Sequence, residues 1–76
     1  MNKERRMAIE EIKSQLSDLQ TDIEEIKDQE EESYENLPDS LQSSERGDCM
    51  TEAIDNLSSA YDALSDAINY LEEAAI

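Results

Sequence analysis

Acidic residues recur at a fixed spacing along the first half of the chain. On a helix, a repeat of seven residues places such side chains on one face, with successive groups about 10.5 Å apart along the axis. Carboxylates in this arrangement could exchange protons, bind a divalent cation, or replace phosphates opposite a basic partner. We call this set the acidic ridge; its members are Glu10, Glu11, Asp18, Glu24, Glu25, Asp28, Glu31 and Glu32, and Glu35 extends it.

Catalysis and metal binding are the weaker interpretations of these carboxylates. The chain has no histidine and one cysteine, Cys49, so the usual zinc sites, Ser-His-Asp triads and Cys-His dyads cannot be built from one chain. Acid–base catalysis by carboxylates needs a pocket that perturbs their pKa values. A calcium loop with its central glycine is also missing around Glu24–Glu32. We therefore predict a protein that is not an enzyme and has no catalytic residue, metal or cofactor.

The overall charge favours a basic partner. There are 21 acidic and 6 basic residues among 76, for a formal net charge of −15. Spread over a helix of ~50 Å, this is about one charge per 3.3 Å. One DNA strand carries one charge per about 3.4 Å. Such a surface disfavours direct binding to nucleic acid or an anionic membrane, and it resembles a nucleic-acid backbone in charge density. The alternative is a solvated face that only keeps the protein in solution.

The elements that must position the ridge are two segments with heptad patterning, whose positions we label a to g. In the first, apolar residues are spaced alternately by three and four positions, which predicts a helix over about 3–35. Facing another helix, the expected contact consists of the a residues Ile9, Leu16 and Ile23 and the d residues Ile12, Leu19 and Ile26. The ridge residues at b and c then point outward.

The second segment has a wider apolar face, which predicts a helix over about 44–75. Its a and d positions are Met50, Ile54, Leu57, Tyr61, Leu64, Ile68, Leu71 and Ala75, and its g positions are Ala53, Ala60, Ala67 and Ala74. A face of a, d and g residues suits a bundle better than a two-stranded coil. We therefore predict a contact with a second copy through Ala53, Leu57, Ala60, Tyr61, Leu64, Ala67, Ile68 and Leu71.

The connection between the segments covers about residues 36–43. Pro38 keeps the preceding residue out of the helical region, so the first helix should end near Glu35 or Asn36. Leu37 and Leu41 should fold back over the end of the core. Ser43 or Ser44 should cap the second helix, and Asp48 is a later alternative. Gly47, in the first turn of that helix, should weaken it modestly.

These elements predict an all-α, coiled-coil-like antiparallel hairpin of two helices, a single domain over residues 1–76. Two such hairpins should pair as a homodimer and form a four-helix bundle, because a lone hairpin leaves part of the apolar a/d/g face of the second helix exposed to solvent. Charge placement agrees with an antiparallel pair. The first helix begins with Lys3, Arg5 and Arg6, and the second ends with Glu72 and Glu73, so the two sets should offset each other.

The first 30 residues contain no apolar run of the kind found in a signal peptide, and no stretch could span a membrane. With a single cysteine, this favours a cytoplasmic protein.

The connection carries a more specific resemblance. Residues 34–42, YENLPDSLQ, followed by Ser44–Gly47 and by Ala53–Leu57, resemble a family of small acidic helical proteins of Firmicutes phages, prophages and mobile elements. The resemblance covers about residues 25–76. It implies a helical hairpin and a mobile-element origin, and it assigns no chemistry and no functional residue.

Two functions follow as hypotheses. In the first, the acidic ridge imitates nucleic acid and inhibits a basic, nucleic-acid-binding host protein, such as a restriction or CRISPR nuclease. In the second, the chain is a structural or adaptor bundle that binds partners through the apolar face of the second helix. A hairpin that docks against a single partner helix is a further alternative.

Overall fold

The computed structural model describes residues 1–76, and every element in it is a helix. Helix α1 is Lys3–Glu35, α2 is Asp39–Gln42 and α3 is Glu45–Ala74. The prediction of an all-helical chain is confirmed. The connection, expected over about 36–43, contains the short helix α2.

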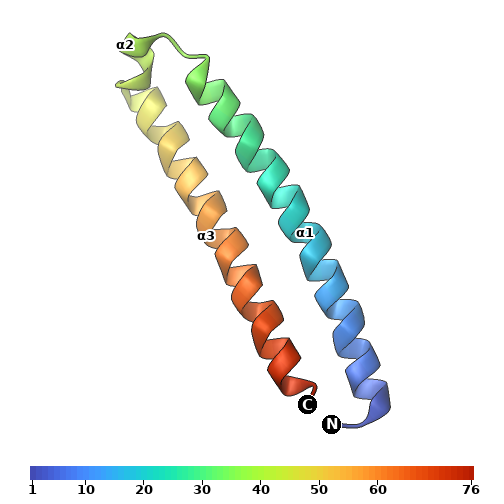
Figure 1. Cartoon of the computed structure of the whole chain (residues 1–76). Helices are drawn as coiled ribbons and strands as arrows, with labels where there is room; N and C mark the ends of the chain where they lie inside the picture. Colours follow the sequence, from blue (N-terminus) through green and yellow to red (C-terminus); the bar gives the residue numbers. More distant parts are fainter.

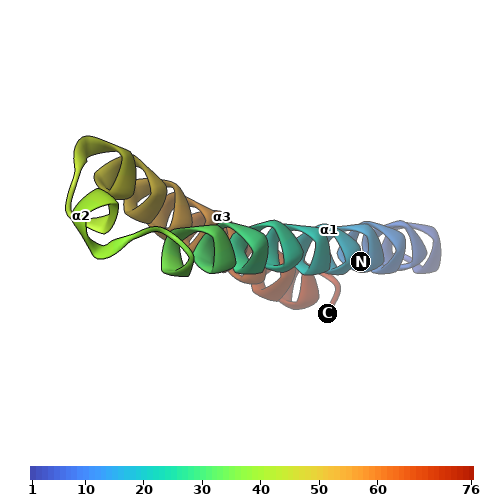
Figure 2. The same cartoon turned by 90° about the horizontal axis from the view of Figure 1, so that it is seen from above.

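The chain forms a long, thin rod. Its principal extents are 58 × 15 × 11 Å, measured on Cα atoms. Figure 1 shows α1 and α3 lying side by side and running in opposite directions, with α2 at one end of the rod. At the other end, the Met1 ammonium donates a hydrogen bond to the carbonyl oxygen of Ile76 at 3.3 Å. Figure 2 shows that α1 and α3 cross at an acute angle.

The ends of α1 are defined by local polar contacts. The side chain of Asn2 accepts a hydrogen bond from the backbone N–H of Arg5 at 2.8 Å, as an N-cap residue does. At the other end, the backbone N–H of Asn36 donates to the carbonyl of Glu32 at 3.0 Å. Pro38 follows two residues later and cannot continue the helix.

Gln42 ties α2 to the end of α1. Its Nε2 donates to the carbonyl oxygens of Tyr34 and Leu37, both at 3.2 Å. The carbonyl oxygen of Tyr34 also accepts from the backbone N–H of Leu37 at 3.1 Å, so the Gln42 side chain adds a second contact to the last turn of α1 and one to the connection that follows it. Leu37 is half-buried, whereas Leu41 is exposed. Leu41 is 40% exposed, so it covers the end of the core less completely than the sequence predicts.

The start of α3 differs from the expected cap. Ser44 is the N-cap residue, but its hydroxyl donates to the carbonyl of Leu41 and does not cap α3. Gly47 is buried, and a Cβ there would overlap the carbonyl oxygen of Gln42 and lie 2.8 Å from that of Leu41. Gly47 thus allows α2 to pack directly on α3, which the sequence analysis did not anticipate.

Helix α1 contacts α3 through its a and e positions. Ile9 and Gln20 are buried, and the later residues of this face are half-buried: Lys13, Leu16, Ile23, Lys27, Glu30 and Tyr34. The predicted a/d contact is wrong, because the d residues Ile12, Leu19 and Ile26 are 44%, 51% and 54% exposed. Gln20 bonds to α3 and the stems of Lys13 and Lys27 pack there, so this side of α1 is turned inward and the d side outward.

Candidate interaction surfaces

The acidic ridge lies on the outward side of α1. All of its predicted members are exposed except Glu31, which is half-buried. Helix α1 is continuous through all of them. The structure therefore presents the carboxylates at regular axial steps on one rigid element.

Two lysines pair with members of the ridge. The Nζ of Lys27 lies 3.7 Å from the Oε1 of Glu31. The Nζ of Lys13 lies 3.2 Å from Oε1 of Glu10 and 3.4 Å from Oε1 of Glu72 on α3. The other six ridge residues form no ion pair: Glu11, Asp18, Glu24, Glu25, Asp28 and Glu32.

Lys13 bridges the two helices. The hydrogen bond that it donates to Glu10 raises the pKa of Lys13 above its ordinary value of 10.5; partial burial opposes this, and the bond to Glu72 adds to it. Glu72 pairs with Lys13, and the predicted offset of Glu72 and Glu73 by Lys3, Arg5 and Arg6 does not take the form of direct ion pairs. These three residues form no ion pair within the chain.

The densest part of the ridge surrounds a shallow hollow on α1. Thr21 and Gln29 line it together with four acidic residues, Glu24, Glu25, Asp28 and Glu32. A cationic side chain placed over this hollow would meet carboxylates on several sides. No group of three or more His, Cys, Asp or Glu residues is arranged to hold a metal ion.

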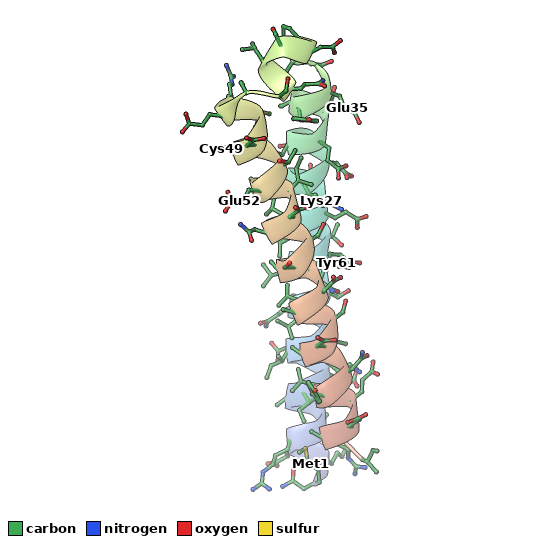
Figure 3. The ribbon with its side chains drawn as sticks, turned by 90° about the vertical axis from the view of Figure 1, so that its left-hand side faces the viewer. Met1, Lys27, Glu35, Cys49, Glu52 and Tyr61 are labelled. Atoms are coloured by element: carbon green, nitrogen blue, oxygen red, sulfur yellow. The ribbon has the colours of Figure 1, made fainter.

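A second hollow, of about 170 Å³, lies between α1 and α3 on one flank of their contact. It is lined by Ile23, Glu24 and Lys27 from α1 and by Ser58, Tyr61 and Asp62 from α3. Figure 3 labels two of these lining residues, Lys27 and Tyr61. The lining mixes both charge signs, so it lacks the apolar character of small-molecule sites.

The residues predicted to contact a second copy are partly covered within the chain. Ala60 is exposed, and the other seven are half-buried: Ala53, Leu57, Tyr61, Leu64, Ala67, Ile68 and Leu71. Each half-buried side chain is therefore covered in part by the rest of the chain, and the remaining surface of these residues is accessible to a partner. Cys49 is exposed and has no disulfide partner.

Gln20 is the structural residue that the sequence analysis missed. It is only 8% exposed. Its Nε2 donates to the carbonyl oxygen of Tyr61 at 3.0 Å and to Oγ of Ser65 at 2.6 Å. The available signal was its e position, where an uncharged amide lies one heptad from Lys13 and one from Lys27.

Comparison with known proteins found no matching family model, curated protein or solved structure. The resemblance to small acidic phage proteins therefore stays a prediction. No helix of the chain combines the length and apolar character needed to cross a membrane.

Proposed function

We propose that this chain is a non-enzymatic protein of phage or mobile-element origin that acts in the host cytoplasm and inhibits a basic, nucleic-acid-binding protein. The acidic ridge occupies the groove that otherwise holds nucleic acid. The observation that carries this proposal is the row of exposed carboxylates on α1, six of which have no cationic partner in the chain.

The geometry of α1 supports imitation of a phosphate backbone. The carboxylates are displayed on a single helix of 33 residues, so they keep their spacing without a partner. Arginine and lysine side chains that bind phosphates form equally good charge-assisted bonds with carboxylates. A rod 58 Å long and about one helix pair wide also fits an elongated groove better than a globular domain would.

Host-defence nucleases are the partners that we would test first. A restriction or CRISPR nuclease has a long basic channel for nucleic acid, and mobile elements benefit from blocking it. This choice rests on the resemblance of residues 34–57 to phage proteins and on charge complementarity, since it is the chemistry of the channel that the ridge matches.

The test compares two double variants that change the net charge equally. Glu24→Lys with Glu25→Lys alters the densest part of the ridge, whereas Asp55→Lys with Asp66→Lys alters exposed acids of α3. Affinity for the nuclease is measured by calorimetry at low and moderate salt. We expect a loss of at least tenfold for the ridge variant and a much smaller loss for the control. Equal losses would mean that net charge alone governs binding.

We further propose that the working unit is an antiparallel hairpin of α1 and α3 and that two hairpins pair as a four-helix bundle. The accessible surface of the chain is 5605 Å². A compact monomer of this mass exposes about 4,700 Å². The excess is similar to the roughly 800 Å² that each partner buries in a standard interface. Sedimentation velocity over a range of concentrations tests this, and a monomer throughout would contradict it.

An adaptor role is the second candidate, and the exposed apolar residues Ala60, Ala63 and Tyr70 of α3 favour it. In that case the apolar face of α3 binds the partner, and the acids only solubilise the chain. Ala60→Glu, at an exposed site on α3, distinguishes the two. If it abolishes partner binding while the ridge variant binds normally, the adaptor function replaces inhibition by the ridge.

A further inference from the structure

We infer that a second copy of this chain docks on the face formed by the d positions of both helices, related by a two-fold axis perpendicular to the rod at the level of Leu19 and Leu64. This rests on the dimer proposed above, and it specifies a face and a symmetry. The face includes α1 residues that the sequence analysis had assigned to the contact within the chain.

The d residues of the two helices share one flank of the rod. On the opposite flank, Glu24 of α1 and Ser58 of α3 line the same hollow, and Lys13 meets Glu72. Position b of α1 and position e of α3 therefore lie together there. Helical geometry then places the d positions of both helices on the other flank. These residues are Ile12, Leu19 and Ile26 on α1 and Leu57, Leu64 and Leu71 on α3.

Contacts between the helices fix how these six residues are layered. Gln20 bonds to Ser65 at 2.6 Å, so the preceding residues, Leu19 and Leu64, lie at the same level to within roughly 3 Å. In the same way, the ion pair between Lys13 and Glu72 at 3.4 Å places the residues that precede them, Ile12 and Leu71, at the same height along the rod. The face is therefore three apolar layers, with Leu19 and Leu64 in the middle one.

This layering is self-complementary. Ile12 and Ile26 lie seven residues on either side of Leu19, and Leu57 and Leu71 lie seven on either side of Leu64. A two-fold axis through the middle layer places Leu19 against Leu19 of the second copy and Ile12 against Ile26 of the second copy. The same two-fold axis relates both α1 and α3 to their counterparts in the second copy, as an isologous interface requires.

Charge complementarity supports the same symmetry. The rotation brings the start of α1, with Lys3, Arg5 and Arg6, beside the end of α1 in the second copy, where the acids are Glu30, Glu31, Glu32 and Glu35. The three basic residues have no ion pair within the chain. A two-fold axis along the rod would instead place the basic start beside the two acids Glu72 and Glu73 of α3, and the acidic end of α1 beside the acidic start of α3. The perpendicular axis places the acidic start of α3 beside Glu72 and Glu73 of the second copy, but it brings the three basic residues to the larger acidic cluster at the end of α1. The net pairing of charges therefore favours the perpendicular axis.

Cross-linking tests the axis directly. In a Cys49→Ser background, Leu19→Cys is treated with a short thiol-reactive cross-linker at a concentration where the protein is dimeric. We expect most of the chain to become covalent dimer. Ile12→Cys alone should cross-link poorly, but an equimolar mixture with Ile26→Cys should give the mixed dimer. Ser17→Cys, an exposed site on the opposite flank, is the control and should stay monomeric. Efficient cross-linking only of Ser17→Cys would overturn the inference.

Sedimentation of charged variants separates this inference from the proposed dimer itself. Leu19→Glu should raise the dimer dissociation constant at least tenfold, whereas Ser17→Glu should leave it within twofold, with circular dichroism showing that both remain helical. If wild-type protein is monomeric at all concentrations, the dimer and this inference both fail. If Leu19→Glu stays dimeric while Ala63→Glu, on the side of α3 away from α1, is monomeric, the dimer stands and this inference fails.

Discussion

At Gln20, one side-chain amide joins α1 to α3 and also fixes their register. Its two hydrogen bonds to Tyr61 and Ser65 are part-buried, and no buried side-chain polar atom in the chain lacks a partner. A satisfied polar group within an apolar contact adds little net stability but makes alternative registers costly, because sliding the helices would leave the amide unpaired.

Gln20→Ala should lower the free energy of unfolding by about 1–2 kcal/mol, because the hydroxyl of Ser65 loses its partner and a cavity is left at the helix contact. The measurement is urea denaturation followed by circular dichroism. Gln15→Ala is the matched control, since Gln15 is an exposed glutamine on the same helix. Equal stabilities of the two variants would show that the hydrogen bonds of Gln20 contribute nothing.

Lys13 gives the molecule a pH-dependent contact at the alkaline end. Its folded-state pKa is raised above the ordinary value of 10.5, mainly by the hydrogen bond to Glu10. The stability that it contributes is therefore fully present below pH 10.5 and is lost as the pH rises through the higher folded-state pKa. Thermal melts of wild type and Lys13→Arg should diverge only in that range, because arginine keeps its charge. A constant difference across the range would contradict this.

At the scale of elements, the heptad pattern was sufficient to predict helices but not which stripe would face inward. An a/d contact and an a/e contact share Ile9, Leu16 and Ile23, and hydropathy alone prefers the isoleucines and leucine at d to Lys13, Gln20 and Lys27 at e. The e side faces α3 because its polar ends find partners there: Ser65, Glu72 and a backbone carbonyl.

The ridge was easier to predict, because outward positions need only helical periodicity. Glu24, Glu25 and Glu32 are exposed as expected. The pairing of Glu31 with Lys27 is a local contact four residues apart, of a kind that sequence spacing does indicate. The pairing of Lys13 with Glu72 depends on the register of two helices, which the sequence alone did not provide.

Packing of α2 on α3 depends on Gly47. Gly47→Ala should destabilise the chain by about 1–3 kcal/mol, because the added methyl group overlaps the carbonyl oxygen of Gln42. This result is opposite to the usual gain from replacing a glycine within a helix. Chemical denaturation measures it, with Ser59→Ala at an exposed site of α3 as the control. A stabilised Gly47→Ala variant would show that α2 does not pack there.

At the scale of the whole molecule, a thin core is combined with a large charge. Ile9 is the only buried apolar residue, and the net charge of −15 opposes any compact state. Each of the two interactions proposed above offsets one of these two destabilising features. A second copy covers the apolar d residues, and a basic partner neutralises the ridge.

Added salt should therefore stabilise the free protein. Raising sodium chloride from about 0.02 M to about 0.5 M shortens the Debye length from roughly 20 Å to about 4 Å and screens most of the repulsion. We expect the melting temperature to rise by several degrees, measured by circular dichroism at constant protein concentration. A melting temperature that falls with salt would mean that attractive ion pairs outweigh the repulsion.

If the ridge takes the place of nucleic acid, the chain must compete with DNA for the nuclease. Fluorescence anisotropy follows labelled duplex DNA bound to a restriction or CRISPR nuclease as the chain is added. We predict that wild type and the Asp55→Lys, Asp66→Lys control displace the DNA completely, whereas Glu24→Lys, Glu25→Lys requires at least tenfold more protein. Formation of a ternary complex, in which the nuclease holds both the chain and the DNA, would contradict it.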